Sequence, residues 1–97
     1  MQIMKPKLIN IEILNDYKIK LSYSNNEIRA FDFAPHLYIG RYVELQDLSL
    51  FNTAKIVSNT IEWDTEIDID PNTLYIKSEL ISYNHLDKNH LEELELV

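Results

Sequence analysis

Four carboxylates stand at alternate positions in one short segment of the chain, at Asp64, Glu66, Asp68 and Asp70. In an extended strand, alternate residues share a face, so these four side chains would form one row of oxygen atoms. Oxygen clusters of this kind suit Ca²⁺ or Mg²⁺. A carboxylate can also catalyse proton transfer when a second acid or a base lies beside it. The segment therefore raises two chemical hypotheses, cation binding and acid–base catalysis.

A calcium-binding loop fits this segment only in part. If the loop begins at Asp68, then Asp70 takes its third position and Glu79 its twelfth. The sixth position requires glycine, but Thr73 stands there, and Pro71 stiffens the loop. We therefore expect a solvated acidic loop without a metal ion, and divalent-cation or small-ligand binding stays the alternative.

Catalysis finds no support elsewhere in the sequence. His85 and His90 are five positions apart, whereas two metal ligands on one helical face lie three or four apart. The chain has no cysteine, and it contains no phosphate-binding loop or nucleophile motif. For Asp68 we expect a structural role, in which its carboxylate accepts backbone N–H groups and fixes the turn before Pro71. The sequence predicts a protein that is not an enzyme and needs no cofactor.

Two aromatic residues flank the acidic segment. Trp63 is the only tryptophan, and its large apolar surface predicts a core position in which the indole N–H finds a partner. The alternative for Trp63 is an exposed interface hot spot, and Tyr75 has the same two interpretations. We favour the core for both, so that they anchor the segment.

The charge balance points to a protein partner. The net charge is −7, and the nine Lys and Arg residues are scattered, so direct binding of nucleic acid is not expected. An acidic surface fits a basic protein, as well as plain solubility. The binding surface that we predict combines Asp64, Glu66 and Asp70 with Leu91 and Leu94 of the C-terminal tail, and a homo-oligomer stays open. No apolar run is long enough to span a bilayer and no secretory signal is visible, so we expect a cytoplasmic protein without a membrane partner.

Alternating apolar residues predict the elements that carry these groups. Period-two patterns over residues 9–13, 17–23 and 27–33 predict an N-terminal antiparallel meander of three strands, in which Ile9, Ile11 and Ile13 share a face. Gly40 is the only glycine, so asparagine must supply the turns, at Asn15-Asp16, Asn25-Asn26, Asn59-Thr60 and Asn72-Thr73. A two-residue turn at Asn25-Asn26 would place Phe31 and Phe33 on the outer face, whereas a bulge would place both in the core.

The rest of the chain predicts an α+β fold. Residues 36–53 favour short helical turns, with Ser49 as a cap and with Leu45, Leu48 and Phe51 packed on the sheet. A β-hairpin follows over residues 54–63, and Leu74 to Ile76 are expected to add a short strand. Residues 1–82 form one domain, and the tail 83–97 is either an amphipathic helix or a frayed end.

The order of several motifs resembles a known family, the domain-of-unknown-function family 2442. The resemblance covers residues 7 to 78 and is carried by Asp32-Phe33-Ala34-Pro35-His36-Leu37, Gly40, Leu45-Gln46-Asp47, Phe51, Trp63 and the run from Ile67 to Tyr75. It implies a small α+β protein of bacteria or phages with no established catalytic activity. Many members are encoded beside a small partner, which implies a non-catalytic binding module that could act as an antitoxin.

Two positions depart from the pattern of that family. Members often have an Asp-Gly turn where this chain has Asn25-Asn26, and often have glycine where this chain has Glu66. The second departure leaves open the backbone shape just before Ile67.

Overall fold

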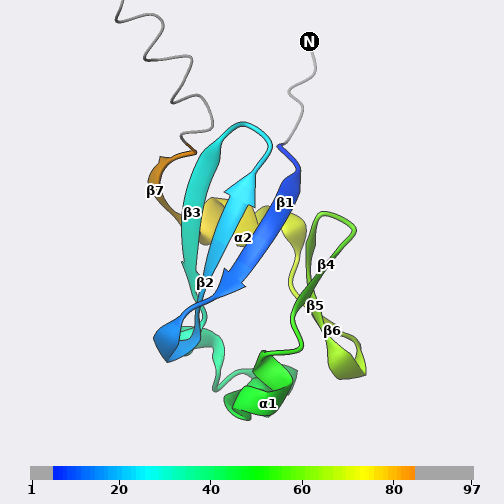
Figure 1. Cartoon of the computed structure of the whole chain (residues 1–97). Coiled ribbons are helices and arrows are strands. Elements are labelled where there is room, and N and C mark those ends of the chain that lie inside the picture. Colours follow the sequence, from blue (N-terminus) through cyan, green and yellow to red (C-terminus); the bar gives the residue numbers. More distant parts are fainter. Residues whose placement is uncertain (1–5, 85–97) are drawn as a thin grey trace, which may run out of the picture.

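The computed structural model describes residues 6–84, and these form an α+β fold with two antiparallel sheets. The larger sheet has the order β1-β2-β3-β7, with strands Leu8–Ile13, Lys18–Tyr23, Glu27–Asp32 and Glu79–Tyr83. The smaller sheet has the order β4-β5-β6, with strands Lys55–Val57, Thr60–Trp63 and Ile67–Asp68. The expected N-terminal meander and the later hairpin are both confirmed (Figure 1).

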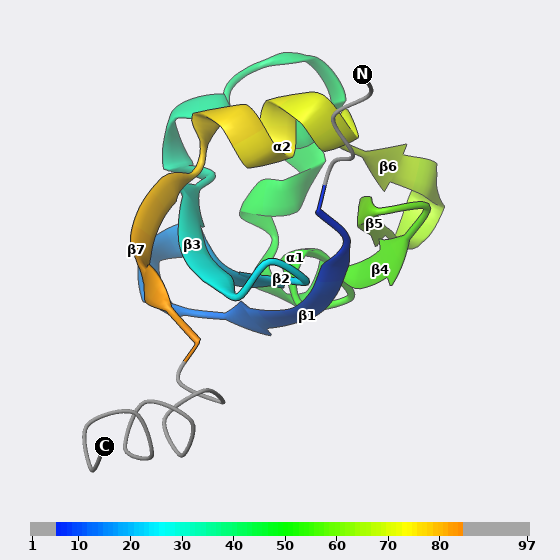
Figure 2. The same ribbon diagram turned by 90° about the horizontal axis from the view of Figure 1, so that it is seen from above.

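Short helices connect the strands and close the core. The α-helices are α1 (Leu48–Phe51) and α2 (Pro71–Lys77), and the 3-10 turns are η1 (Asn15–Tyr17), η2 (Ala34–His36), η3 (Gly40–Gln46) and η4 (Asp64–Glu66). Figure 2 shows the larger sheet curved like a trough, with α2 across its open side and the smaller sheet beside β1. The core lies inside this enclosure. None of the described helices is long and apolar enough to cross a membrane.

The turn between β2 and β3 decides where the phenylalanines lie. Ser22 pairs with Ile28 and Ile19 with Phe31, so residues 24–26 form a three-residue loop and not a two-residue turn. Asn26 takes the left-handed conformation that such a loop needs, with φ of 71°. Phe31 and Phe33 are therefore both in the core, with 1% and 0% of their surface exposed, as the bulged alternative predicts.

Ile9, at the start of β1, does not share the inner face of the strand with Ile11 and Ile13, so that prediction is wrong. A register shift between Leu8 and Asn10 leaves Ile9 without a partner in β2. The shift turns Leu8 into the core, whereas Ile9 is 55% exposed. Ile11 and Ile13 remain packed against the core as expected.

The helical segment forms as predicted, but with a different cap. Asp47, not Ser49, is the N-cap of α1, and its Oδ1 accepts the backbone N–H of Ser49 at 2.9 Å. Leu45 and Phe51 are fully buried, whereas Leu48 points to solvent and is 56% exposed.

Residues 74–76 belong to helix α2, so the strand predicted there is wrong. Asp70 caps this helix, since its Oδ2 accepts the backbone N–H of Thr73 at 3.0 Å, and Pro71 follows in the first turn. The turn expected at Asn72 is absorbed into the same helix. Leu74, on the inner face of α2, is fully buried. The larger sheet instead gains its fourth strand from β7, which the sequence pattern did not predict.

One side chain joins the two sheets. Asn59, in the β4–β5 turn, accepts the backbone N–H of Leu8 through Oδ1 at 2.6 Å. Its Nδ2 donates to the carbonyl of Pro6 at 3.2 Å. Asn59 thus occupies backbone groups along the outer edge of β1, where that strand faces β4.

Candidate functional site

The acidic segment does not form a flat row of carboxylates. Asp64 to Glu66 form the turn η4, in which Thr65 and Glu66 both have left-handed backbones, with φ of 68° and 63°. Only Ile67 and Asp68 form a strand, and Asp70 has left it to cap α2. Across residues 6–84, no group of three or more acidic, His or Cys side chains is close enough to hold a metal ion. The expected alignment of Asp64, Glu66, Asp68 and Asp70 is therefore wrong, although all four are exposed.

Glu66 occupies a backbone conformation that suits glycine. A left-handed residue with a Cβ meets steric strain, which glycine avoids. This is the position at which the resemblance leads one to expect glycine. Glu66 thus adopts, with a side chain, a conformation that glycine would take without strain.

Trp63 anchors the segment in the core, as predicted. It is 1% exposed, and its Nε1–H donates to the carbonyl of Phe51 at 2.9 Å. Its ring also stacks on that of Phe51, with centroids 5.9 Å apart, and meets Phe33 edge-on at 5.2 Å. The backbone N–H of Asp64 donates to Oγ1 of Thr53 at 3.0 Å, which ties the start of η4 to the turn that follows α1.

The structural role predicted for Asp68 belongs to Asp70. The carboxylate of Asp68 accepts no backbone N–H from the described residues. Its backbone pairs with Glu62 of β5, and its carbonyl accepts the hydroxyl of Tyr42 at 3.0 Å. Asp70 is the residue that fixes the turn at Pro71, because it caps α2. Asp68 alternates with the buried Ile67 and Ile69 and therefore points to solvent.

Tyr75 anchors α2 through a polar cluster on the concave side of the larger sheet. Its hydroxyl donates to Oε1 of Glu27 at 2.7 Å, and the Arg29 guanidinium lies 4.4 Å from its ring centre. Arg29 also donates to Glu27 at 2.8 Å and to Oγ of Ser78 at 2.6 Å. The Tyr75 hydrogen bond lowers the pKa of the Glu27 carboxyl and raises that of Tyr75 itself, and Arg29 lowers the Glu27 pKa further.

Tyr23 lies beside this cluster but takes no part in its hydrogen bonds. Its ring meets Tyr75 edge-on at 4.9 Å. The hydroxyl is buried and has no partner among the described residues. Burial raises the pKa of Tyr23 to about 12, so the group stays neutral at physiological pH.

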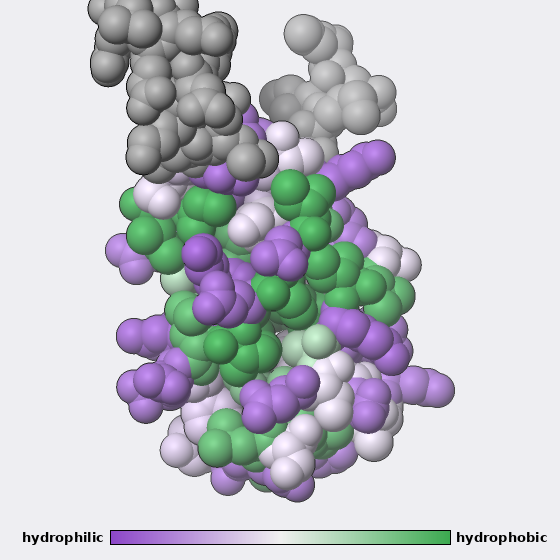
Figure 3. Space-filling model, viewed as in Figure 1, coloured by the Kyte–Doolittle hydropathy of each residue, from purple (hydrophilic) through white to green (hydrophobic). Residues whose placement is uncertain are grey.

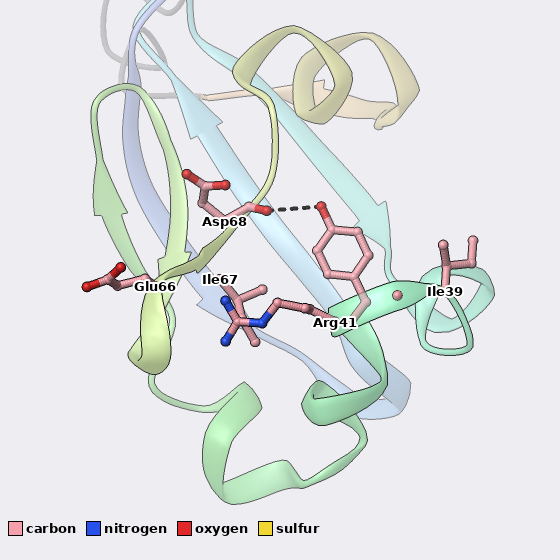
Figure 4. A pocket seen from close by; sticks show the side chains of 7 residues that line it. Ile39, Arg41, Glu66, Ile67 and Asp68 are labelled. Carbon is pink, nitrogen blue, oxygen red and sulfur yellow. Dashed lines mark hydrogen bonds between the residues drawn. The ribbon is translucent and has the colours of Figure 1, made fainter.

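A pocket of about 310 Å³ lies where η3 meets the acidic segment. Its lining residues are Ile39, Gly40, Arg41, Tyr42, Glu66, Ile67 and Asp68 (Figure 4). Arg41 spans one side, donating from Nη2 to the carbonyl of Thr65 at 2.9 Å and from Nε to Glu44 at 3.3 Å. Figure 4 shows the Glu66 and Asp68 carboxylates pointing in different directions from the rim. Burial raises the pKa of Tyr42, and Asp68 and Asp70 add to this shift.

Three large apolar side chains stand exposed on the segment that forms the other wall of this pocket. Tyr38 is 78% exposed, Ile39 58% and Val43 46%. The sequence predicted no interface there, because the segment lacks a regular period that would separate an inner from an outer face. Leu91 and Leu94, which were predicted to supply the apolar area, lie outside the described residues.

Comparison with known proteins gives one result, a match to a protein family. The profile of one family, described as "Protein of unknown function (DUF2442)", matches residues 8–79. No curated protein and no solved structure shows a significant match to the chain. The match covers the smaller sheet, strands β1 to β3 of the larger sheet, the acidic segment and α2, and it ends at the first residue of β7. The chain therefore belongs to the DUF2442 family.

Proposed function

We propose that this protein is a non-catalytic, cytoplasmic binding module that holds a basic protein partner on the surface formed by Tyr38, Ile39, Val43, Glu66 and Asp68. This set is called the η3 surface below. One observation carries the proposal: three large apolar side chains are exposed within six consecutive residues, and one of them, Ile39, lines a pocket together with Glu66 and Asp68 of the acidic segment. An apolar centre with a charged rim is the common plan of protein interfaces, and aromatic residues are enriched in them.

The apolar part of the η3 surface would supply most of the affinity. Full burial of a large apolar side chain contributes about 1.5–3 kcal/mol. Tyr38 has the greatest exposed fraction of the three, and a tyrosine loses little rotamer freedom on binding. It is therefore the residue that we expect to act as the hot spot.

The acidic part would supply attraction to a basic partner. Glu66 and Asp68 form the rim of the pocket, and Asp64 and Asp70 are exposed nearby in the chain. With a net charge of −7, the protein as a whole also draws a basic partner from a distance. Exposed charges of this kind mainly raise the association rate, and salt screens them. An antitoxin-like role, in which this surface covers a basic active site, fits both features.

Site-specific photo-crosslinking in the native host tests the proposal. A photoreactive amino acid at Tyr38 should trap a defined protein, whereas the same group at Lys20, on the convex face of the larger sheet, should not. The trapped protein is then purified, and its binding is measured by calorimetry at low and high salt. We expect Tyr38→Ala to weaken binding by about tenfold or more.

Charge reversal supplies the matched comparison. Glu66→Lys and Asp68→Lys should slow association and reduce its salt dependence. Glu12→Lys makes the same change in charge on β1, where the ion pair of Glu12 with Lys20 is long, at 3.8 Å, and exposed. The proposal fails if no partner binds at low salt, or if Glu12→Lys weakens binding as much as the η3 variants do.

A small ligand is the second candidate, and the pocket is the observation that favours it. Its volume of about 310 Å³ lies at the lower end of the range for ligand sites. Gly40 is the only glycine of the chain and lines this pocket, so its amide signal gives an unambiguous NMR probe. A ligand library, together with Ca²⁺, Mg²⁺ and Mn²⁺, would be titrated against it. A saturable shift at Gly40 supports this candidate, and a signal that never moves ends it.

A further inference from the structure

Two neighbouring residues of η3 bind the backbone of the acidic segment. Arg41 donates from Nη2 to the carbonyl of Thr65 at 2.9 Å, and the hydroxyl of Tyr42 donates to the carbonyl of Asp68 at 3.0 Å. Figure 4 shows the Arg41 side chain extending from η3 towards the acidic segment. The partners are 24 and 26 residues away in the sequence, so these bonds join the apolar and the acidic half of the η3 surface.

The backbone that Arg41 binds is strained. Thr65 and Glu66 are both left-handed, with φ of 68° and 63°. This conformation is rare for a β-branched residue such as threonine, and it persists only where the surrounding structure holds it. The carbonyl of Thr65 belongs to the peptide that joins the two strained residues. Arg41 therefore restrains the turn at its strained point.

The charge of Arg41 does not explain its place in this surface. A cation beside Glu66 and Asp68 opposes the attraction of a basic partner. The ion pair with Glu44 contributes little to stability, because 57% of the Arg41 side chain and 47% of the Glu44 side chain are exposed. The geometry of the guanidinium gives the better explanation, since this planar group donates to Glu44 and to the Thr65 carbonyl at the same time.

We propose that Arg41 is a positioning residue, which fixes the left-handed turn so that Glu66 stays at the pocket beside Ile39. This inference rests on the proposed function, because it assigns Arg41 a role in the same η3 surface. A surface that is already ordered loses less conformational entropy when its partner binds. Removal of Arg41 should therefore weaken the binding of a basic partner, although it makes the surface more acidic.

NMR spectroscopy of the protein alone tests the restraint. A left-handed residue has a short distance between its amide and α protons, so its intraresidue NOE is strong. Glu66 should show this NOE in the natural protein and lose much of it in Arg41→Ala and in Arg41→Lys, which keeps the charge but cannot donate to both acceptors. Thr65→Gly, added to Arg41→Ala, should restore the NOE, because glycine takes the left-handed conformation without strain. An NOE that Arg41→Ala leaves unchanged, or that Thr65→Gly does not restore, overturns the proposal.

Binding experiments then test whether the restrained turn serves the partner. The protein trapped by the photoreactive amino acid at Tyr38 is titrated by calorimetry with the Arg41 variants and with Lys18→Ala. Lys18 is exposed next to the buried Ile19 of β2, so it lies on the outer face of the larger sheet, where hydrophilic and hydrophobic residues are interspersed (Figure 3). Lys18→Ala removes the same charge without touching the turn. Both Arg41 variants should raise the dissociation constant by about fivefold, and Lys18→Ala should not raise it.

The outcomes separate the positioning role from the proposed function. A dissociation constant that is unchanged or lower in Arg41→Ala overturns the positioning role and leaves the proposed function intact, since the charge would then outweigh the geometry. If no protein is trapped at Tyr38, the proposed function fails, whatever the NOE of Glu66 shows. Far-UV circular dichroism confirms that each variant is folded.

Discussion

Replacing Glu66 with glycine should stabilise the protein, although it removes a side chain. Glu66 is exposed, and its backbone is left-handed, with φ of 63°. A residue with a Cβ loses about 1–2 kcal/mol in this conformation. Glycine avoids that strain but adds about 0.5–1 kcal/mol of unfolded-state entropy. The difference leaves a gain of about 0.5–1 kcal/mol for Glu66→Gly, since both effects act on the backbone.

Urea unfolding followed by the fluorescence of Trp63 measures this change. Trp63 is the only tryptophan and is 1% exposed, so its emission reports loss of the core. Far-UV circular dichroism provides a second probe, which reports the secondary structure of the whole protein. In thermal unfolding, a gain of 1 kcal/mol corresponds to a rise in Tm of about 4–8 °C for a domain of this size.

Two control variants separate the backbone from the side chain. Glu66→Ala removes the same carboxylate but keeps the Cβ, so its stability should stay close to that of the natural protein. Glu12→Gly makes the identical change within β1, where glycine should lower stability by about 0.5–1 kcal/mol. The reasoning is refuted if Glu66→Gly destabilises the protein as Glu12→Gly does, or if Glu66→Ala gains as much as Glu66→Gly.

Three further predictions concern α2 and the cluster beneath it. Asp70→Ala should lower the free energy of unfolding by about 1 kcal/mol through loss of the α2 cap, and Asp70→Asn should restore most of it. Tyr23→Phe should raise the free energy of unfolding by about 1 kcal/mol, since it removes a buried hydroxyl that has no partner among the described residues. The lowered pKa of Glu27 means that its contribution to stability is full above its ordinary pKa and is lost as the pH falls through the folded-state value. The stability difference between the natural protein and Glu27→Gln should therefore shrink as the pH falls from neutral through the folded-state pKa of Glu27.

Urea unfolding at fixed temperature measures all three. For Asp70, an asparagine variant as unstable as the alanine variant would show that the cap is not the cause. For Tyr23, a phenylalanine variant that is less stable than the natural protein would mean that the hydroxyl has a favourable partner. For Glu27, parallel pH curves for the natural protein and Glu27→Gln would contradict the assigned pKa shift.

The parts of the fold that the sequence predicted are those set by local pattern. Strict alternation marks β2, and its predicted inner face, with Ile19, Leu21 and Tyr23, is the buried one. The face of Phe31 depended on one extra loop residue, which shifts every later side chain to the opposite face. The bulge at Ile9 has no local signal either, because it arises from pairing with β2.

The errors near α2 have a common cause. Leu74-Tyr75-Ile76 has the composition of a strand, but the cap at Asp70 and the proline at position 71 start a helix there. Both signals are present in the sequence, at Asp70 and Pro71. Strand β7 was missed because its pairing with β3 joins residues that are far apart in the chain.

For the candidate site too, the sequence could not predict features that depend on contacts between distant residues. The sequence located the acidic residues, but it placed them on one strand face, and the left-handed pair at Thr65 and Glu66 prevents that. The exposed apolar residues of the η3 surface could not be separated from core residues by sequence, since residues 36–53 have no regular period. Only the folded chain brings Ile39 and Asp68 to one pocket.

The hydrogen bonds of Asn59 bear on what happens in concentrated solution. A protein with two open sheet edges can add copies at both ends without limit, which is the route to fibres. Here Asn59 occupies the N–H of Leu8, at the start of β1, and the carbonyl of Pro6 just before it, so this end of the edge offers no free template. Replacement of Asn59 by alanine would expose both backbone groups, and we expect the variant to associate more readily than the natural protein at high concentration.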